Sequence, residues 1–401
     1  MDIQLAPRIE RLPTYVLGRL KQMIYDRRKD GADVIDMNMG NPSDPPPDAV
    51  VEKIRDAVLD PRNSRYSVSK GVYNLRKDMA DKYERKWGVK LDPDAEVIAT
   101  IGSKEGFSHM CLALLGPGDS AVVADPAFQI HTTAVVLAGA STISVPLGND
   151  EAFLGDIDRV LDRMTPQPKL VILCYPHNPT GMTVDDDFFP KVVEICKRHQ
   201  VMVVNDFAYG ETCFDGYKAP SILQAPGAIE HGCEFSTMSK PYNMAGWRIG
   251  FCCGNAQMIA GLATVKGYYD YGIFQAVQIA AIVAMREGDR HIEQQNAKYQ
   301  ARRDQLVTGL RRLGWEVEPP RASMFLWAKP PREQLDAYGG TSESFCLAMV
   351  EEAEVAMTPG GAFGPRGEHH VRLALVENEH RIRQALRNLG RVLNTPKLAV
   401  A

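Results

Sequence analysis

Between about residues 96 and 251, short apolar runs alternate with amphipathic segments, and this alternation constrains the fold more than any other feature. The runs typical of buried strands are Val97–Ile101, Ala121–Ala124, Leu170–Cys174, Val201–Val204 and Ile249–Cys252. Strands that alternate with helices predict an α/β fold built on a mostly parallel sheet. In such sheets ligands bind beyond the carboxyl ends of the strands, so the loops that follow these strands are where we expect chemistry.

The segments before and after this region have a different pattern. Before it we expect a helix over 19–29, an extended stretch over 34–40, a Pro-rich turn over 41–47 and a helix from about Asp48. After about Gly288 we expect a long charged helix over 291–313, short strands at 324–327 and 371–375, and a last helix from about Glu379. We therefore predict a large domain over 46–286 and a smaller α+β domain made of 1–45 and 287–401.

The composition excludes several classes of protein. The 401 residues carry a net charge of −4, whereas a general nucleic-acid binder of this size should be basic, so no nucleic-acid partner is expected. We expect no signal peptide, because the first residues have no basic segment followed by an apolar one, and no apolar stretch reaches the roughly 18 residues that a membrane span needs. None of the eight cysteines forms a C-x-x-C pair, which predicts reduced thiols in a cytoplasmic protein without disulfides or a metal site.

Polar side chains follow three of the expected strands. Asn178 comes after Leu170–Cys174, Asp206 and Tyr209 follow the next strand, and Lys240 follows a third that ends near Ser236. Each is weak alone, but together they match what pyridoxal phosphate (PLP) requires. The cofactor needs a Schiff-base lysine, a carboxylate that keeps its pyridine nitrogen protonated, and a donor at its phenolic oxygen. Lys240, Asp206 and the pair Asn178 and Tyr209 would supply these.

A phosphate cradle is also expected. Strand Val97–Ile101 leads through Gly102, Ser103 and Lys104 into an apolar helix, so free N–H groups and the positive helix end meet at this turn. Hydroxyl groups beside Lys240 and a planar guanidinium eight residues after it would add donors to the same phosphate. These residues are Thr237, Ser239 and Arg248.

The spacing Ser-Lys-x-x-x-x-x-Gly-x-Arg over 239–248, with Asn-Pro-x-Gly at 178–181 and Asp-x-x-Tyr at 206–209, resembles the class I/II aminotransferases of PLP fold type I. The resemblance covers essentially the whole chain. It implies the PLP cofactor, amino acid and 2-oxo acid substrates, and a homodimer.

The resemblance also implies individual roles. Tyr66 would reach the phosphate of the partner subunit, and Phe128 would stack on the cofactor ring. Arg372 would clamp the substrate α-carboxylate, with help from the backbone of Gly40 and from Asn178, and Tyr15 would touch the substrate. Tyr268–Tyr271 could line the partner's pocket, although clustered tyrosines also form interface cores.

Within the family, the motifs are most similar to bacterial glutamate–pyruvate (alanine) transaminases and their diaminopimelate aminotransferase relatives. Two residues depart from the pattern: Phe128 stands where a tyrosine is usual, and His177 precedes Asn178 where a small residue is expected. The expected reaction is amino transfer between alanine and 2-oxoglutarate. Diaminopimelate, aspartate, methionine or aromatic aminotransferases and a PLP β-lyase remain alternatives.

The expected mechanism places a proton carrier at Lys240. An ordinary lysine has a pKa too high for a base at neutral pH, and we expect burial and the nearby Arg248 to lower it. A retained Arg372 argues against decarboxylation, because it fixes the carboxylate. We expect neither a DNA-binding regulator nor a nicotinamide enzyme. The regulator would carry a helix-turn-helix extension, and the nicotinamide enzyme would carry a G-x-G-x-x-G turn after its first strand; we find neither in that context.

Overall fold

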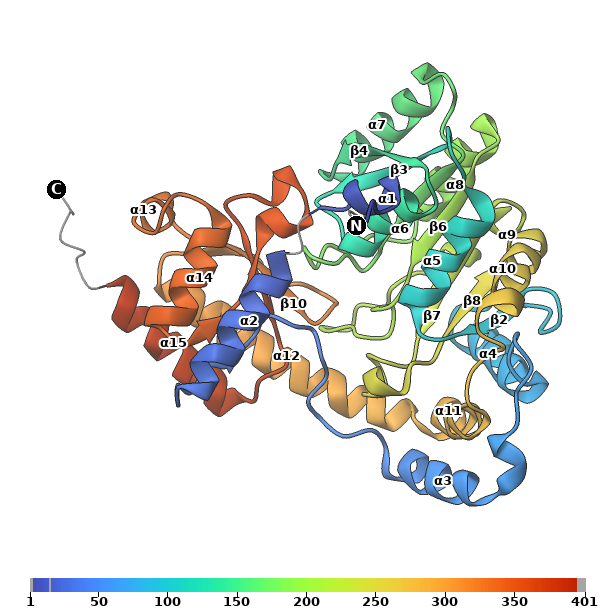
Figure 1. The fold of residues 1–401 in the computed structure, drawn as a ribbon, viewed down its shortest axis with the longest axis horizontal. Coiled ribbons are helices and arrows are strands. Elements are labelled where there is room, and N and C mark those ends of the chain that lie inside the picture. Colours follow the sequence, from blue (N-terminus) through green and yellow to red (C-terminus); the bar gives the residue numbers. More distant parts are fainter. Residues whose placement is uncertain (1–2, 14–15, 395–401) are drawn as a thin grey trace.

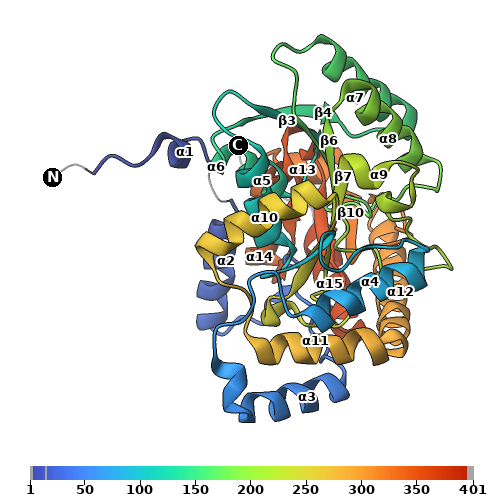
Figure 2. The ribbon, with the colours of Figure 1, turned by 90° about the vertical axis from the view of Figure 1, so that its right-hand side faces the viewer.

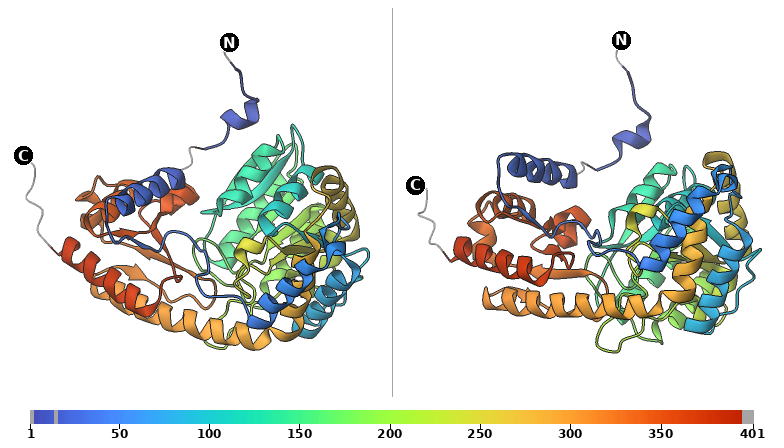
Figure 3. Two further views of the ribbon diagram at one scale, coloured as in Figure 1. Left: turned by 60° about the horizontal axis from the view of Figure 1, so that its bottom comes forward. Right: turned by 90° about the horizontal axis from the view of Figure 1, so that it is seen from below.

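The computed structural model describes residues 3–13 and 16–394, so Tyr15 lies outside the described residues. The polypeptide forms two lobes, and the long helix α12 (Asp289–Arg312) runs along both of them (Figure 3). The larger lobe holds the green and yellow part of the chain, and the smaller lobe holds the red C-terminal part together with the blue helix α2 (Val16–Lys29) (Figure 1).

A seven-stranded sheet forms the centre of the larger lobe, in the order β2-β8-β7-β6-β5-β3-β4. Its strands are β2 (Val97–Thr100), β3 (Ser120–Asp125), β4 (Ser141–Pro146), β5 (Leu170–Leu173), β6 (Met202–Asp206), β7 (Gly232–Thr237) and β8 (Gly250–Gly254). The strands β4, β3, β5, β6 and β7 are parallel, and β8 lies antiparallel between β7 and β2. The predicted α/β fold with a mostly parallel mixed sheet is confirmed.

Both faces of this sheet are covered, which is why its strands are apolar on both sides. Leu170 and Ile172 pack into the cluster formed with α5, α6 and α10, whereas Val171 and Leu173 pack into the cluster with α4, α7, α8 and α11. Alternate residues of a strand point to opposite faces, so a continuous apolar run is what a doubly covered strand requires. The helices are α4 (Tyr73–Trp87), α5 (Ser103–Leu114), α6 (Gln129–Leu137), α7 (Asp150–Arg163), α8 (Phe188–His199), α9 (Ala228–His231), α10 (Ala256–Tyr269) and α11 (Gln275–Glu287).

The smaller lobe is built on a four-stranded antiparallel sheet in the order β12-β13-β10-β9. Buried side chains of α12, α14 and α15 pack against it, among them Leu306, Phe345 and Ile382. The strands are β9 (Glu316–Val317), β10 (Phe325–Lys329), β12 (Thr358–Pro359) and β13 (Val371–Ala374). The helices are α13 (Arg332–Asp336), α14 (Ser342–Glu352) and α15 (Glu379–Leu393).

The N-terminal segment contributes to both lobes. Strand β1 (Ile35–Asp36) pairs in parallel with β11 (Val355–Ala356), and α2 packs on α14 through Leu20, Ile24 and Val350. Helix α3 (Asp48–Leu59) instead lies beside α11 at the edge of the larger lobe (Figure 2). The division into 46–286 and 1–45 plus 287–401 stays a prediction, and these contacts are in keeping with it.

The remaining features agree with the composition. All eight cysteine thiols are free. Within residues 3–13 and 16–394, no helix is both long enough and apolar enough to cross a bilayer. The short helix α1 (Pro7–Glu10) precedes α2 and lies beside α6.

The first prediction concerns Gly250, which starts β8 where this strand passes the turn after β2. A Cβ atom built there would lie 2.8 Å from the Ser103 nitrogen and 2.8 Å from the Ser236 oxygen, and neither backbone atom can move freely. We expect Gly250→Ala to lower the free energy of unfolding by about 1–3 kcal/mol, the usual effect of overpacking.

The control is Gly155→Ala in α7, where a Cβ meets nothing within 4 Å. Removing a glycine from a helix interior should stabilise the protein by about 0.5–1 kcal/mol. Urea denaturation measures both variants, and equal stabilities of the two would contradict the close approach of β8 to the β2 turn.

Candidate functional site

Lys240 is the third residue after the end of β7 at Thr237, and its side chain points toward the N-terminal segment. Its Nζ donates a hydrogen bond to the carbonyl oxygen of Gly40 at 2.5 Å. Burial, followed by the positive charges of Arg372 and Arg248, lowers the pKa of Lys240 to about 8, and the Asp206 carboxylate opposes this shift. The expected direction of the shift is confirmed, so this amine can gain and lose a proton near neutral pH.

Arg372 is buried in β13, the second strand of the small sheet, and is not on an edge. Its guanidinium donates from Nη1 to Asn178 Oδ1 at 2.8 Å and from Nη2 to the Asn38 carbonyl oxygen at 2.9 Å. The Cζ atom of Arg372 lies 4.0 Å from the ring centre of Phe325 and 4.7 Å from that of Phe363.

The guanidinium of Arg372 lacks a counter-ion. Among the described residues it forms no ion pair, and its Nε has no hydrogen-bond partner. Burial lowers its pKa to about 10. A buried cation without an acidic partner is costly, so the arrangement favours an anionic ligand, and a carboxylate fits a guanidinium in two-pronged fashion.

Asn178 reaches Arg372 from the loop after β5. Only its carbonyl oxygen is used in that bond, so its amide nitrogen can donate to a ligand. The neighbouring His177 is buried, with Nδ1 2.7 Å from Thr180 Oγ1, and burial and His131 lower the pKa of His177 to about 3. His177, which departs from the family pattern, is therefore a neutral side chain that is buried within the loop and bonded to Thr180 of the same loop.

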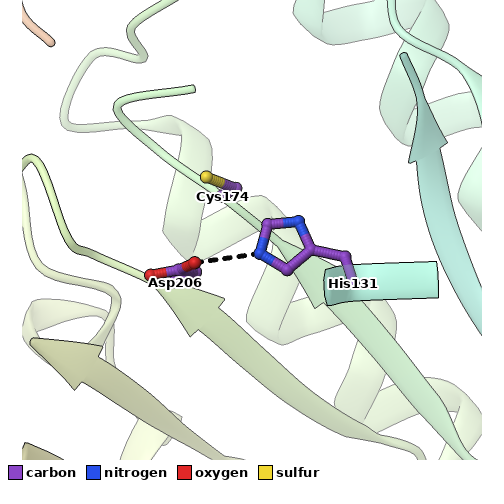
Figure 4. A group of neighbouring side chains, drawn as sticks. All are labelled: His131, Cys174 and Asp206. Carbon is purple, nitrogen blue, oxygen red and sulfur yellow. Dashed lines mark hydrogen bonds and ion pairs between the residues drawn. The ribbon is translucent and has the colours of Figure 1, made fainter. Parts of the chain in front are cut away.

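Asp206, at the end of β6, lies beside a histidine that the sequence analysis missed. Its Oδ2 is 2.9 Å from His131 Nε2, and its Oδ1 accepts from the backbone of Ala208 at 3.3 Å (Figure 4). The Cys174 sulfur is close to both, and the three donor atoms lie within 4.8 Å of one another. Burial, followed by the charge of Asp206, raises the pKa of Cys174, so its thiol stays protonated beside that carboxylate.

The turn after β2 has the geometry of an anion cradle. Gly102 adopts a φ of 76°, and a Cβ there would lie 2.4 Å from Nη2 of Arg248. Arg248 itself has a left-handed φ of 55° and donates to the Ala245 carbonyl oxygen at 3.0 Å. The guanidinium thus sits against the first turn of α5, where Ser103 and Lys104 present their N–H groups.

Three other predicted site residues are Thr237, Phe128 and Tyr209. Thr237 donates to the Ile249 carbonyl oxygen at 3.4 Å and accepts from the Ser239 nitrogen at 3.1 Å, so its hydroxyl is engaged by backbone. The ring centre of the half-buried Phe128 is 5.9 Å from the Lys104 ammonium. Burial raises the pKa of Tyr209, so its phenol stays a donor.

Tyr66 does not join the site within this chain. Its side chain is 91% exposed, and its ring lies 5.6 Å from that of Tyr271. Tyr268 and Tyr269 are also exposed. Tyr15 lies outside the described residues, so its expected contact stays a prediction.

Three further residues belong to the same surroundings. Asn38 and Thr358 hold Arg372, the latter with its hydroxyl 3.3 Å from Nη2. The third, His131, lies one helical turn after Phe128 in α6, which is the one signal that could have revealed it. Nothing in the local sequence around Asn38 or Thr358 identifies either residue.

The donor set fits PLP, the cofactor expected from the sequence. The Asp206 carboxylate has no ion pair except with His131 among the described residues, so it can accept from a protonated ring nitrogen. The Gly102 turn is shaped so that a Cβ would fill it. Arg372, Lys240 and Arg248 supply positive charge on the side that would face anionic groups.

Comparison with known proteins gives a consistent result. The family "Aminotransferase class I and II" matches residues 32–389. The glutamate-pyruvate aminotransferase AlaC of Escherichia coli is 45% identical over 95% of this chain and 92% of its own length. The LL-diaminopimelate aminotransferase of Moorella thermoacetica is 41% identical over 98% of this chain and 99% of its own. The solved structure of substrate-bound BacF from Bacillus subtilis superposes with a TM-score of 0.92, at 30% identity and full coverage of both chains.

The second prediction uses the lowered pKa of Lys240. The unfolded chain binds this proton more tightly than the folded one, so the stability penalty is present below about pH 8 and disappears as the pH rises to 10.5. We expect cofactor-free Lys240→Met to exceed the cofactor-free unsubstituted protein in free energy of unfolding by about 1–2 kcal/mol near pH 7.

Urea denaturation near pH 7 and near pH 10 measures this difference. The advantage of Lys240→Met should shrink at the higher pH, where the amine of the folded protein is already neutral and that of the unfolded chain has begun to lose its proton. An advantage that is the same at both pH values would mean that Lys240 is not desolvated as described.

Proposed function

This chain belongs to the class I and II aminotransferases and is a PLP-dependent transaminase, and from that premise we propose that it transfers an amino group between alanine and 2-oxoglutarate. The assignment of this substrate pair is supported by the 45% identity to a glutamate-pyruvate aminotransferase over 95% of the chain. The roles of the individual residues below belong to the same proposal.

The observation that carries the proposal is the buried guanidinium of Arg372 without an acidic partner. Amino acids and 2-oxo acids share one group, the α-carboxylate, which matches the two-pronged donor of an arginine. Phe325 and Phe363 pack against the guanidinium, so a ligand would approach it from a direction that neither ring occupies. Arg372 would therefore fix the end of the substrate that all candidate substrates have in common, while Gly40 and Asn178 border that place.

Lys240 would move the proton at the substrate Cα. When bound, PLP supplies the electron sink that makes this proton removable. Lys240 would tether the cofactor at rest, and its amine would be released as the amino acid binds. A pKa of about 8 would let that amine accept the proton from the substrate Cα and return it to the cofactor carbon that is bonded to the substrate nitrogen.

Asp206 would keep the pyridine nitrogen protonated, and His131 would hold Asp206 in place through their 2.9 Å contact. The cradle of Gly102, Ser103 and Lys104, with Arg248, would hold the phosphate, joined by Ser239 and Thr237.

The ring surroundings complete the proposal. Phe128 would stack on the cofactor, and Tyr209 and Asn178 would donate to its phenolic oxygen. Tyr66, exposed in a single chain, would reach the phosphate of a partner subunit in a homodimer. A cytoplasmic location is in keeping with the eight free thiols.

The second candidate is an aminotransferase for LL-diaminopimelate. A relative with that name is 41% identical and is matched over 99% of its length, so overall similarity does not separate the two substrates.

The third prediction separates the two substrates by the absorbance of the cofactor. A visible absorption band of the cofactor-loaded protein should bleach on addition of alanine and of glutamate, each alone, because each is the amino donor for one half of the proposed reaction.

Bleaching by diaminopimelate, aspartate or a sulfur amino acid only would keep the transaminase and replace the substrate pair. No band after addition of PLP would contradict the site itself. The matched control is Lys240→Ala, which should not be bleached at the same rate because its proton carrier is missing.

The fourth prediction concerns the carboxylate clamp. Lysine keeps the charge of Arg372 but loses the planar fork, so Arg372→Lys should lower kcat/KM for alanine by about 10–100-fold. Steady-state kinetics measures this, with Arg381→Lys as the control, since Arg381 pairs with Asp33 at the surface. Equal kcat/KM values for the two variants would place the substrate carboxylate elsewhere.

A further inference from the structure

Glu234 is a fully buried acid that the proposed reaction does not use. It lies in the middle of β7, opposite Asn205 on β6 and Cys253 on β8. Four donors surround its carboxylate, and none of them is charged. Its Oε1 accepts from Tyr83 Oη at 2.9 Å and from Ser221 Oγ at 2.7 Å.

The other oxygen of Glu234 binds the residue that connects it to the site. Its Oε2 accepts from the Ile222 nitrogen at 3.0 Å and from Asn205 Nδ2 at 3.0 Å. Burial raises the pKa of Glu234 to about 7, while the four donors favour the carboxylate. A buried polar network of this kind is costly when incomplete, so each donor has a defined place.

Asn205 connects Glu234 to the segment that follows the neighbouring strand β5. With Nδ2 bound to Glu234, its Oδ1 must face the other way, and it accepts from the Tyr175 nitrogen at 3.1 Å. Tyr175 is the second residue after β5, at the point where the chain leaves the sheet. Asn205 is fully buried, so it touches neither substrate nor cofactor itself.

The loop that begins at Tyr175 is closed on itself and has little freedom of its own. The His177 nitrogen donates to the Met182 carbonyl oxygen at 2.8 Å, and the Gly181 nitrogen donates to the His177 carbonyl oxygen at 2.8 Å. Prolines at 176 and 179 fix two further φ angles. The position of Asn178 is therefore set mainly by the point at which the loop is attached to the sheet.

We infer that Asn205, held by Glu234, is a positioning residue for Asn178: it anchors the Tyr175 amide and so fixes Asn178 against Arg372. This inference rests on the proposed role of Asn178 and Arg372 in binding the substrate carboxylate. Asn205 also directly precedes Asp206, so the same anchor sits beneath two predicted cofactor contacts.

A matched pair of variants separates positioning from simple core stability. Asn205→Ala and Tyr83→Phe each remove one hydrogen bond to Glu234, but only Asn205→Ala releases the Tyr175 amide. We expect Asn205→Ala to raise KM for the amino acid about five- to tenfold, the range for one lost hydrogen bond. Tyr83→Phe should change KM by less than about twofold, even though it lowers the melting temperature.

The second measurement needs no catalysis. Hydrogen exchange of the cofactor-free protein should show faster exchange of the peptide covering 174–182 in Asn205→Ala and unchanged exchange there in Tyr83→Phe. Unchanged exchange of this peptide in Asn205→Ala would overturn the inference. If Asn205→Ala does not yield folded protein, Asn205→Leu serves in its place, because leucine fills a similar volume but can neither accept from the Tyr175 amide nor donate to Glu234.

A double-mutant cycle with Asn178→Ala distinguishes a failure of the positioning role of Asn205 from a failure of the proposed substrate site. If Asn205 acts through Asn178, Asn205→Ala should raise KM by less than about twofold in the Asn178→Ala background. Equal effects in both backgrounds would overturn the positioning role. If Asn178→Ala alone leaves KM unchanged, the proposed substrate site itself is wrong, whatever the exchange data show.

Discussion

The buried guanidinium of Arg372 is the interaction on which the rest of the site depends. A buried cation packed against two aromatic rings, without an acid beside it among the described residues, persists only where the surrounding fold holds it. Its hydrogen bonds come from three distant segments: Asn38 near the N-terminus, Asn178 after β5, and Thr358 in β12. Both lobes and the N-terminal segment must therefore be in place before this side chain can face a carboxylate.

The charges of the site are arranged in two groups, and this arrangement explains its chemistry. Arg372 and Arg248 lie near Lys240 and, together with burial, lower the pKa of its amine into the range where it can carry a proton. Asp206 lies beside His131 and has no other ion pair among the described residues. Cationic groups thus gather where carboxylate and phosphate are expected, and the carboxylate of Asp206 is placed where a ring cation is expected.

Much of this could be predicted from the sequence, because its signals are local. Apolar runs of four or five residues predicted the strands, and the polar residues at or after the ends of β5, β6 and β7 are the basis of the proposed site. The run Ile249–Cys252 predicted strand β8, but no local signal gives the antiparallel direction of β8 between β7 and β2, and the half-exposed β4 was not predicted. Asn38 and Thr358 were missed because their importance lies in side-chain contacts between residues far apart in the chain, which neither spacing nor composition reveals, and His131 was missed although its spacing from Phe128 offered a signal.

The most direct test of the account is a crystal structure of the PLP-loaded protein with 2-methylalanine, an alanine analogue that lacks the removable Cα proton. The account predicts both carboxylate oxygens within about 3 Å of the Arg372 guanidinium, with Asn178 beside them. A carboxylate bound elsewhere, with Arg372 still bonded only to Asn38, Asn178 and Thr358, would contradict it.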